Sequence, residues 1–383
     1  MEESGDGSKG YCLEKFAIFL IGIINNIPFT IINSNSQRIA AHYHMEGYLG
    51  AVVWSTAFCG LFAGYLNSWL STRSMGYIGR YIAVVLTMGV GLSIVSFAQN
   101  FWVSCAGMIF IGFAVNFGES VCLGYLPYSG RDDIVVFWTA GTATSGVLGG
   151  LYAVLCVRFN IPYSTSFYSL LPLPVIYFLT YFFALRKQRQ KMNDGDSLVS
   201  SVNEGGNEEI KCFSLSLIKK VMKYIFPLGI SYFSLYSTVG PFLDCSQTSE
   251  ELNEKPYEFP LLQLSCHLGL VAASLSIHVF DYTHLWNLAI IQVIIFVVWL
   301  TQAMLRWMYT WAKYVMIVLG GIITGLVYTN TYHMCLDDKT MSKKEREVGV
   351  TIVSFAINLT VLIDSLFNIL MEKTFLAPYV PKK

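Results

Sequence analysis

Acidic side chains inside long apolar runs are the residues of this sequence best suited to chemistry. Glu119 lies deep in the run IFIGFAVNFGESVCLGYL, with Asn116 one helical turn before it. Asp364 lies in another apolar run, between Thr360 and Asn368. An ionised side chain in the middle of a bilayer is costly and usually faces a cavity or a partner. We therefore expect Glu119 to titrate protons or bind a substrate. A structural hydrogen bond is the alternative for it and for Asp364.

A pair of asparagines predicts a second polar feature. Asn25 and Asn26 lie midway along the first apolar run, just before Pro28. Proline removes a backbone donor and frees a carbonyl group. This set predicts a helix break that exposes polar backbone to a cavity. Hydrogen bonds from the two amides to a neighbouring helix are the alternative.

Tyrosines and amides in later runs predict a lining for a polar organic ligand. Tyr232 and Tyr236 lie in one run, and Tyr328 and Asn330 lie in another. Each tyrosine combines an apolar ring with a hydroxyl group that can donate or accept a hydrogen bond. Tyr332 lies close to the end of its run, so the alternative interpretation for it is a place in the aromatic belt at the membrane interface.

Small residues mark another run as a helix that packs closely. This run opens with Trp138 and includes Thr142, and both residues are candidates for a substrate or proton pathway. GxxxG spacings occur at Gly146/Gly150, Gly60/Gly64 and Gly321/Gly325. Helix packing is the interpretation we prefer for these glycine pairs.

Signatures of enzymes, metal centres and cofactor sites are missing from the sequence. It contains no GxSxG, HExxH, Walker A or CxxC motif, so no enzymatic activity and no cofactor or metal is expected. His42 and His44 form an H-x-H, which is a weak metal signal without further ligands nearby.

The elements that must position these residues are membrane helices. Of the 383 residues, 54% are hydrophobic and only 13% are charged, against about 25% charged residues in a soluble domain. Lys plus Arg equals Asp plus Glu at 25 each, and this balance disfavours a nucleic-acid partner. The apolar runs predict an all-α polytopic protein with about eleven spans, at 15–33, 48–71, 79–98, 101–126, 134–157, 165–185, 220–243, 257–280, 283–305, 312–335 and 348–371.

Charge distribution predicts the orientation of the chain. With the N-terminus in the cytosol, most of the 25 lysine and arginine residues fall on the cytosolic side, and the C-terminus is lumenal. The predicted parts are a tail (1–14), a six-helix half (15–185), a cytosolic linker (186–219), a five-helix half (220–371) and a lumenal tail (372–383). A stop-transfer cluster, with contact to anionic lipid as the alternative, is expected at Arg186, Lys187, Arg189 and Lys191.

Three segments, in order and at nearly the same spacing, resemble the battenin family of lysosomal and vacuolar membrane proteins. They are Gly22 to Asn26; Gly118-Glu119 through Arg131 to Trp138-Thr-Ala-Gly-Thr142; and Tyr328-Thr-Asn-Thr-Tyr-His333 with the later Arg346-Glu347. The resemblance implies a major-facilitator-like fold with a six-plus-five division. It also implies a function in clearing glycerophosphodiesters from an acidic organelle, with effects on basic amino acids and organelle pH. The bilayer, a small polar solute and protons are the partners expected.

Two positions depart from the family pattern. Leu235 stands where the family has a glutamate, and Gly320-Gly321 stands where it has Glu-Gly. If those carboxylates couple protons or bind solute, Glu119 carries more of that function in this chain. A carrier of the equilibrative nucleoside type and a membrane scaffold without transport activity are the two alternatives.

Overall fold

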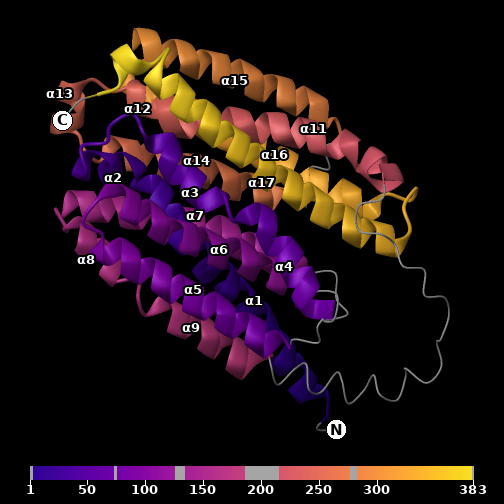
Figure 1. Ribbon diagram of the computed structural model, residues 1–383. Coiled ribbons are helices and arrows are strands. Elements are labelled where there is room, and N and C mark those ends of the chain that lie inside the picture. Colours follow the sequence, from indigo (N-terminus) through magenta and orange to yellow (C-terminus); the bar gives the residue numbers. More distant parts are fainter. Residues whose placement is uncertain (1–2, 73–75, 126–133, 186–214, 277–282, 382–383) are drawn as a thin grey trace.

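The computed structural model describes residues 3–72, 76–125, 134–185, 215–276 and 283–381. The described residues form helices and connecting turns and contain no strand (Figure 1). The first group of helices comprises α1 (Glu3–Ser34), α2 (Ser36–His42), α3 (Leu49–Ala57), α4 (Gly60–Thr72), α5 (Tyr77–Phe97), α6 (Phe101–Tyr125), α7 (Ile134–Arg158), α8 (Tyr163–Tyr168), α9 (Leu173–Thr180) and η2 (Tyr181–Leu185).

The second group follows the segment 186–214. It comprises α11 (Leu215–Ser237), η3 (Thr238–Phe242), α12 (Leu243–Cys245), α13 (Ser249–Glu254), α14 (Glu258–Ser276), α15 (Leu285–Leu305), α16 (Thr310–Asp337), α17 (Lys343–Lys373) and η4 (Ala377–Tyr379). Most of the predicted linker 186–219 lies outside the described residues, including Arg186, Lys187, Arg189 and Lys191.

Most of the long helices of the bundle have the length and hydropathy of membrane spans. Among the described residues, 9 helical stretches are long and apolar enough to cross a bilayer. Each corresponds to one of the predicted spans. The two predicted spans that remain, 220–243 and 257–280, match α11 through α12 and α14, which pack inside the same bundle. The all-α membrane fold predicted from hydropathy is therefore confirmed.

Large apolar side chains also cover the outside of the bundle. They include Leu86 on α5, Ile290 on α15 and Leu370 on α17, at 62%, 58% and 60% exposure. Burying such side chains in lipid rather than water gains free energy, at about 25 cal/mol per Å². The outer faces of these helices are therefore suited to acyl chains.

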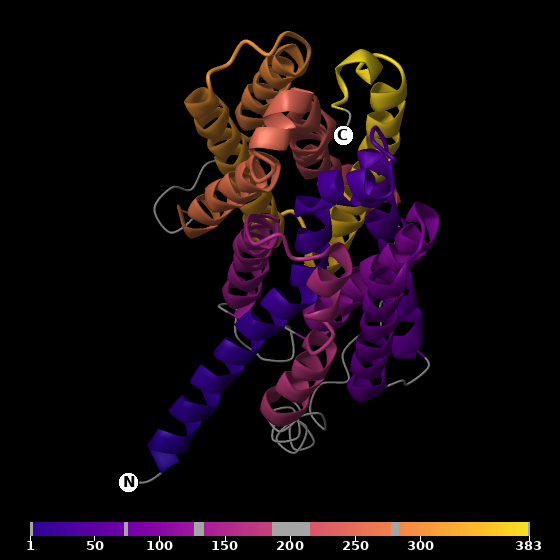
Figure 2. The same cartoon turned by 90° about the vertical axis from the view of Figure 1, so that its left-hand side faces the viewer.

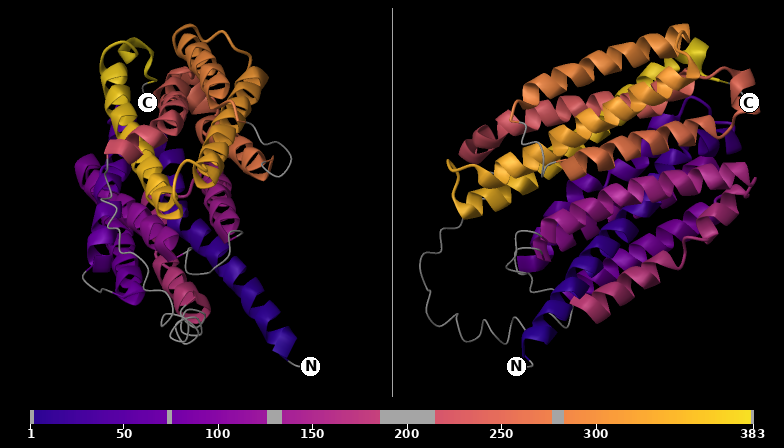
Figure 3. Two further views of the ribbon diagram at one scale, coloured as in Figure 1. Left: turned by 90° about the vertical axis from the view of Figure 1, so that its right-hand side faces the viewer. Right: turned by 180° about the vertical axis from the view of Figure 1, so that it is seen from behind.

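The helices pack as two groups that meet along a seam (Figures 2 and 3). In the first group α1 packs on α7, and α6 packs on α5, α3 and α4. In the second group α16 packs on α14, and α11 packs on α15 and α17. Contacts of α7 with α14 and of α3 with α17 join the groups. Residues far apart in the sequence are thus brought to face each other.

Glycine spacings lie at these helix contacts, as we predicted for packing. A Cβ at Gly146 of α7 would lie 2.4 Å from the Nδ1 of His267 on α14. A Cβ at Gly321 of α16 would lie 2.2 Å from the carbonyl oxygen of Cys266. At Gly60 the neighbour is the Asn116 side chain, at 2.9 Å. All three GxxxG pairs allow close approach of two helices.

The helix break occurs at a different proline from the predicted one. Helix α1 runs without interruption from Glu3 to Ser34, with Pro28 inside it. The second group has the break instead. There α11 passes into the π-helix η3, where Gly240 has non-helical angles (φ −94°, ψ −106°) directly before Pro241. The prediction of a break in the first span is therefore wrong, because α1 accommodates its proline within a continuous helix.

Candidate substrate path between the two helix groups

Glu119 and four tyrosines face one another across the seam. Tyr232 and Tyr236 are one helical turn apart on α11, so they share a face, and their ring centroids lie 6.1 Å apart. Tyr328 on α16 lies 6.0 Å from the Tyr232 ring and 4.8 Å from the Tyr332 ring. Glu119, on α6, is close enough to interact electrostatically with all four tyrosines. Sequence reasoning selected these residues separately, and the fold brings them together.

The Glu119 carboxyl group is available for binding. Its side chain is partly exposed, and it has no hydrogen-bond or ion-pair partner among the residues that the structure describes. Phenol hydroxyls can donate to a carboxylate and to the oxygens of a polar solute. The arrangement can therefore take up a proton or a hydrogen-bonding solute between the two helix groups.

A cavity of about 100 Å³ lies beside this cluster, between the same two groups. Tyr232 and Tyr236 line it together with polar residues that sequence reasoning did not select as pathway residues: Thr30, Asn33, Gln263, His267, Thr324 and Asn368. Thr30 and Asn33 belong to the first group of helices, on α1, and Ser36 on α2 also lines the cavity from this group. The cavity is thus a mainly apolar space that several polar side chains enter, with walls from both groups, as expected for a site where alternating access takes place.

The helix break supplies polar backbone to this cavity. Val239 and Gly240 line the wall, and Gln263 donates from its Nε2 to the Val239 carbonyl at 2.9 Å. The same amide lies 3.4 Å from the Asn33 carbonyl on α1. Gln263 therefore stabilises the broken helix and connects it to the other group.

Asp364 is held by neighbours rather than left free. Ser237 donates a hydrogen bond to its Oδ1, and Asn368 donates to its Oδ2 at 2.8 Å. The carboxyl group is fully buried. Of the two alternatives for Asp364, the structure favours the local hydrogen-bonded one. Its contact with the cavity is indirect, through Asn368.

Asn25, Asn26 and Thr142 join helices of the first group. Asn25 donates from its Nδ2 to the Val115 carbonyl on α6 at 2.9 Å. Asn26 donates to the Gly22 carbonyl at 3.1 Å and to the Thr142 hydroxyl on α7 at 3.3 Å. The bond to Gly22 lies within α1, and the bonds to Val115 and Thr142 are the interhelical bonds named above as the alternative to a cavity lining.

Three further candidates lie away from the cavity lining. Trp138 is buried in the core of the first group. Asn116 donates to the Gly112 carbonyl one turn earlier, at 2.8 Å. Asn330 is buried and donates to the Leu326 carbonyl at 2.8 Å. Trp138 and Asn330 are thus buried structural residues, whereas Asn116 is partly exposed but bonded within its own helix.

The two departures from the family pattern prove to be neighbours. A Cβ at Gly320 would lie 3.9 Å from the Leu235 side chain and 3.7 Å from the Gln292 amide. Leu235 lines the cavity, and both amide atoms of Gln292 are buried without a hydrogen-bond partner in the part of the chain that the structure describes. Leu235 and Gly320 therefore stand beside an amide at this place, and Glu119 is a carboxyl that interacts electrostatically with all four tyrosines.

The two histidines proposed as a weak metal signal differ in their surroundings. The His42 ring stacks on Tyr163 with centroids 4.9 Å apart, whereas the exposed His44 lines a second, outer pocket. Among the described residues, no group of three or more His, Cys, Asp or Glu side chains could hold a metal ion.

Comparison with known proteins gives one family over almost the whole chain. The family model described as CLN3 protein matches residues 16–212 and 206–377. Battenin of Dictyostelium discoideum is 25% identical over 94% of this chain and 94% of its own length. Protein btn1 of Schizosaccharomyces pombe is 24% identical over 96% of this chain and 93% of its own.

The fold is also similar to that of a solved transporter. A bacterial homologue of the human lysosomal transporter Spinster, in an inward-facing and unoccupied conformation, matches with a TM-score of 0.63. The sequence identity is 13%, and the match covers 94% of this chain and 82% of that one. At this identity the match concerns the fold alone, which is of the major facilitator type. Together with the family match over both helix groups, it leads to one conclusion: the chain belongs to the CLN3 protein family, the family of battenin.

Proposed function

We propose that this protein is a secondary transporter of the lysosomal or vacuolar membrane that exports small polar solutes, with glycerophosphodiesters as the substrate class. The observation that supports the proposal is the cluster of Glu119 and four tyrosines between the two helix groups, next to the cavity. Rocking of two helix groups about a central cavity is how this fold class moves solutes.

The chemistry of the cluster fits such solutes. Hydroxyl groups of glycerol and oxygens of a phosphodiester need donors and acceptors, which the tyrosines, Gln263 and Asn368 supply. Glu119 adds a group that can bind a proton. Organelle location and substrate class come from the battenin resemblance, and coupling to protons follows from the presence of a carboxyl group on the path.

Organelle metabolite profiling tests this proposal. Lysosomes or vacuoles are purified from cells that lack the protein, and from the same cells rescued with wild type or with Glu119→Gln. We expect glycerophosphodiesters to accumulate in the absence of the protein, wild type to clear them, and Glu119→Gln to leave them. Immunoblotting of the organelle fraction establishes that each variant reaches its membrane.

A matched control variant tests whether the effect of Glu119→Gln depends on the position of the carboxylate or only on the loss of one negative charge. Glu250 is an exposed carboxylate on α13 that is not among the residues lining the cavity. The substitution Glu250→Gln removes the same charge and should clear the solutes like wild type. No accumulation in the cells without the protein would contradict the substrate class. Normal clearance by Glu119→Gln would contradict the role of that carboxyl group.

A further inference from the structure

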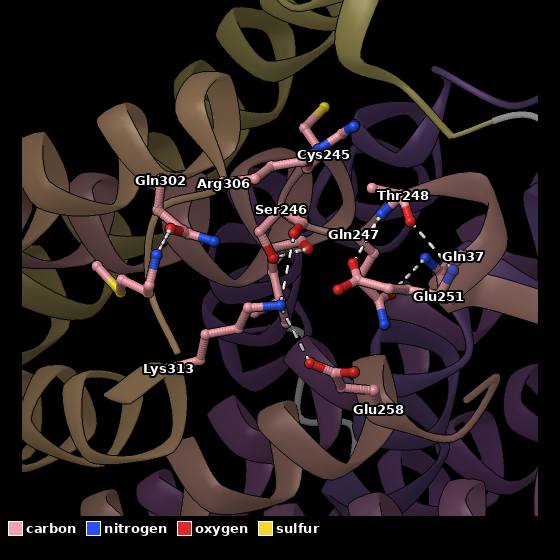
Figure 4. Close-up of polar contacts among 12 residues, drawn as sticks. Gln37, Cys245, Ser246, Gln247, Thr248, Glu251, Glu258, Gln302, Arg306 and Lys313 are labelled. Atoms are coloured by element: carbon pink, nitrogen blue, oxygen red, sulfur yellow. Dashed lines mark hydrogen bonds and ion pairs between the residues drawn. The ribbon is translucent and has the colours of Figure 1, made fainter. Parts of the chain in front are cut away.

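The two helix groups touch at the end of the bundle where α2, α12 and α13 lie, the predicted lumenal end. Gln37 on α2 donates from its Nε2 to the Oδ1 of Asp244 on α12 at 2.6 Å. The same amide lies 3.2 Å from the Oε1 of Gln247. Figure 4 shows Gln37 reaching the 243–249 segment from the opposite group. These bonds close the seam at one point.

A second contact closes the seam on the α17 side. The Lys373 ammonium lies 3.4 Å from the ring centroid of Tyr48, just before α3. The neighbouring Glu372 is 2% exposed. Its carboxyl group lies near the amides of Leu49 and Gly50 at the start of α3, but within the described ranges neither oxygen has a hydrogen-bond partner of normal geometry.

Three carboxyl groups gather at these contacts. Asp244 interacts electrostatically with Glu46, and Glu372 interacts with Asp244. Glu46 and Glu372 line an outer pocket of about 430 Å³, and one Glu46 oxygen is buried without a hydrogen-bond partner among the residues described. The pocket gives the solution at this end of the bundle access to the cluster.

A neighbouring carboxylate, Glu258, differs from Asp244 and Glu372 because it forms an ion pair. Glu258 on α14 is as buried as Asp244, and Lys313 on α16 lies 3.2 Å from its Oε1 (Figure 4). Asp244 and Glu372 have no lysine or arginine within ion-pair distance among the described residues. Uncompensated carboxylates that are buried and close together repel each other and favour their neutral form.

The groups that face these carboxyls come from every element packed around them. Arg306, which follows α15, is the cation nearest to Asp244, but its guanidinium donates to the Cys245 and Tyr379 carbonyls. The remaining polar and titratable neighbours are Gln37, His44, Tyr48, Cys245, Gln247 and Lys373.

We propose that Asp244 and Glu372, with Glu46 beside them, form a proton-binding site that controls closure of the two helix groups at the lumenal end. With the carboxyls protonated, the seam closes as in this structure. With the carboxyls ionised, their repulsion and their need for water open it. The inference rests on the proposed transport function, to which it adds the coupling ion and the step at which that ion acts.

The direction of the pH effect follows from the closed seam. Burial raises the pKa of Asp244 to about 7 in the closed structure, against an ordinary value of 3.8. The closed state therefore binds the proton more tightly than an open, hydrated state. Closure is favoured in acid and is lost as the pH rises through about 7. Each carboxyl that changes its protonation alters the closure equilibrium by up to about tenfold per pH unit.

Hydrogen exchange of the full-length protein in detergent, without any solute, tests this inference. Amide exchange of segments 36–50 and 243–249 is measured at about pH 5 and about pH 7.5, and each rate is corrected for the intrinsic pH dependence of exchange. We expect both segments to be about tenfold or more better protected at the lower pH. The double variant Asp244→Asn, Glu372→Gln mimics the protonated groups and should be protected equally at both pH values.

A control variant and the contrary results complete the test. Glu254→Gln removes an exposed carboxylate of α13 in the same region and should keep the wild-type pH response. Equal protection of wild type at both pH values would overturn the inference, as would a wild-type pH response in the double variant. Because no solute is present, a pH-dependent seam supports the inference even if organelle profiling rejects the proposed substrate class.

Discussion

Glu119 and Asp364 show how two acidic residues of membrane helices differ in function. Asp364 is fully buried and receives hydrogen bonds from Ser237 and Asn368. Glu119 is partly exposed, faces tyrosines of the other helix group and has no hydrogen bond among the described residues. From these contacts we infer that Asp364 stabilises the fold, whereas Glu119 is available to bind a proton or a solute.

Asp364 predicts a stability effect. The substitution Asp364→Ala leaves Ser237 and Asn368 without their acceptor, and we expect it to lower the free energy of unfolding by about 1–3 kcal/mol. Asp364→Asn keeps one acceptor oxygen and should cost less. Thermal unfolding of the detergent-solubilised protein measures both. An unchanged unfolding midpoint in Asp364→Ala, together with abolished transport, would instead assign Asp364 to the transport path.

Asp338, the residue directly after α16, predicts a pH-dependent contribution to stability. Partial burial raises its pKa, but hydrogen bonds from Lys223, Thr340 and Tyr224 outweigh this and hold the pKa below its ordinary value. The stabilisation is therefore complete above the ordinary value of about 4 and is lost as the pH falls through the lower pKa of the folded protein.

The matching experiment compares wild type with Asp338→Asn over a pH series. Since Lys223 is 55% exposed, solvent screens the pair and we expect a loss of only about 1 kcal/mol at neutral pH. The difference between the two proteins should shrink below about pH 4. A difference in unfolding midpoint that stays constant across the series would show that the carboxylate charge contributes nothing.

Helix α14 depends on glycines of its neighbours for its position. It packs against α7 at Gly146 and Gly150 and against α16 at Gly321 and Gly325. In this way α14 carries Gln263 and His267 to the cavity. Without side chains at these glycines, the helix axes can approach closely, so that dispersion contacts along the whole length of the helices contribute.

A methyl group at one of these contacts should therefore separate the helices. In Gly321→Ala the added Cβ would lie 2.2 Å from the Cys266 carbonyl oxygen, and we expect a loss of about 1–3 kcal/mol or more from overpacking. Gly89 on α5 is the matched control, because a Cβ there meets nothing within 4 Å. Gly89→Ala should be neutral or slightly stabilising, by up to about 1 kcal/mol. Thermal unfolding of both variants measures these effects. Equal unfolding midpoints for Gly321→Ala and Gly89→Ala would refute the packing interpretation.

The sequence predicted the helices better than their irregularities. Span positions follow from hydropathy because a bilayer demands about 20 apolar residues in a row. The short helices α2, α8 and α13 leave no such signal. The break was expected at Pro28 and occurs at Gly240-Pro241. A glycine before the proline was the useful sign, since glycine tolerates angles outside the helical region.

The candidate site was predictable in its individual members but not in its assembly. Glu119 and the tyrosines could be selected because polar groups in apolar runs are costly. His267, Gln263 and the seam contact between Gln37 and Asp244 join helices far apart in the chain. No periodicity within one helix specifies which helix of the other group it will meet. Such contacts follow only from the packing of the whole bundle.

The whole molecule is best understood as two helix groups with a polar path between them and a seam at one end. The cluster of Glu119 and tyrosines lies where both groups contribute side chains. The outer carboxyls lie where the groups touch. If the groups move relative to each other, these two places change together, and the path opens to one side at a time.

The competing carrier class predicts a different substrate response in the same molecule. A carrier of the equilibrative nucleoside type would bind nucleosides in the path. We expect nucleosides in excess not to inhibit flux of a glycerophosphodiester, because the proposed site recognises hydroxyl and phosphodiester oxygens. Complete inhibition by nucleosides in a flux assay would favour the other class.

Flux through the purified protein is the measurement that tests the central claim most directly. Full-length protein is reconstituted into liposomes with an acidic side, and transfer of labelled glycerophosphocholine is followed for wild type, Glu119→Gln and Glu250→Gln. The account predicts flux above that of protein-free liposomes for wild type and Glu250→Gln, and a loss of at least about tenfold for Glu119→Gln, equivalent to about 1.4 kcal/mol. No flux with wild type, or full flux with Glu119→Gln, would contradict it.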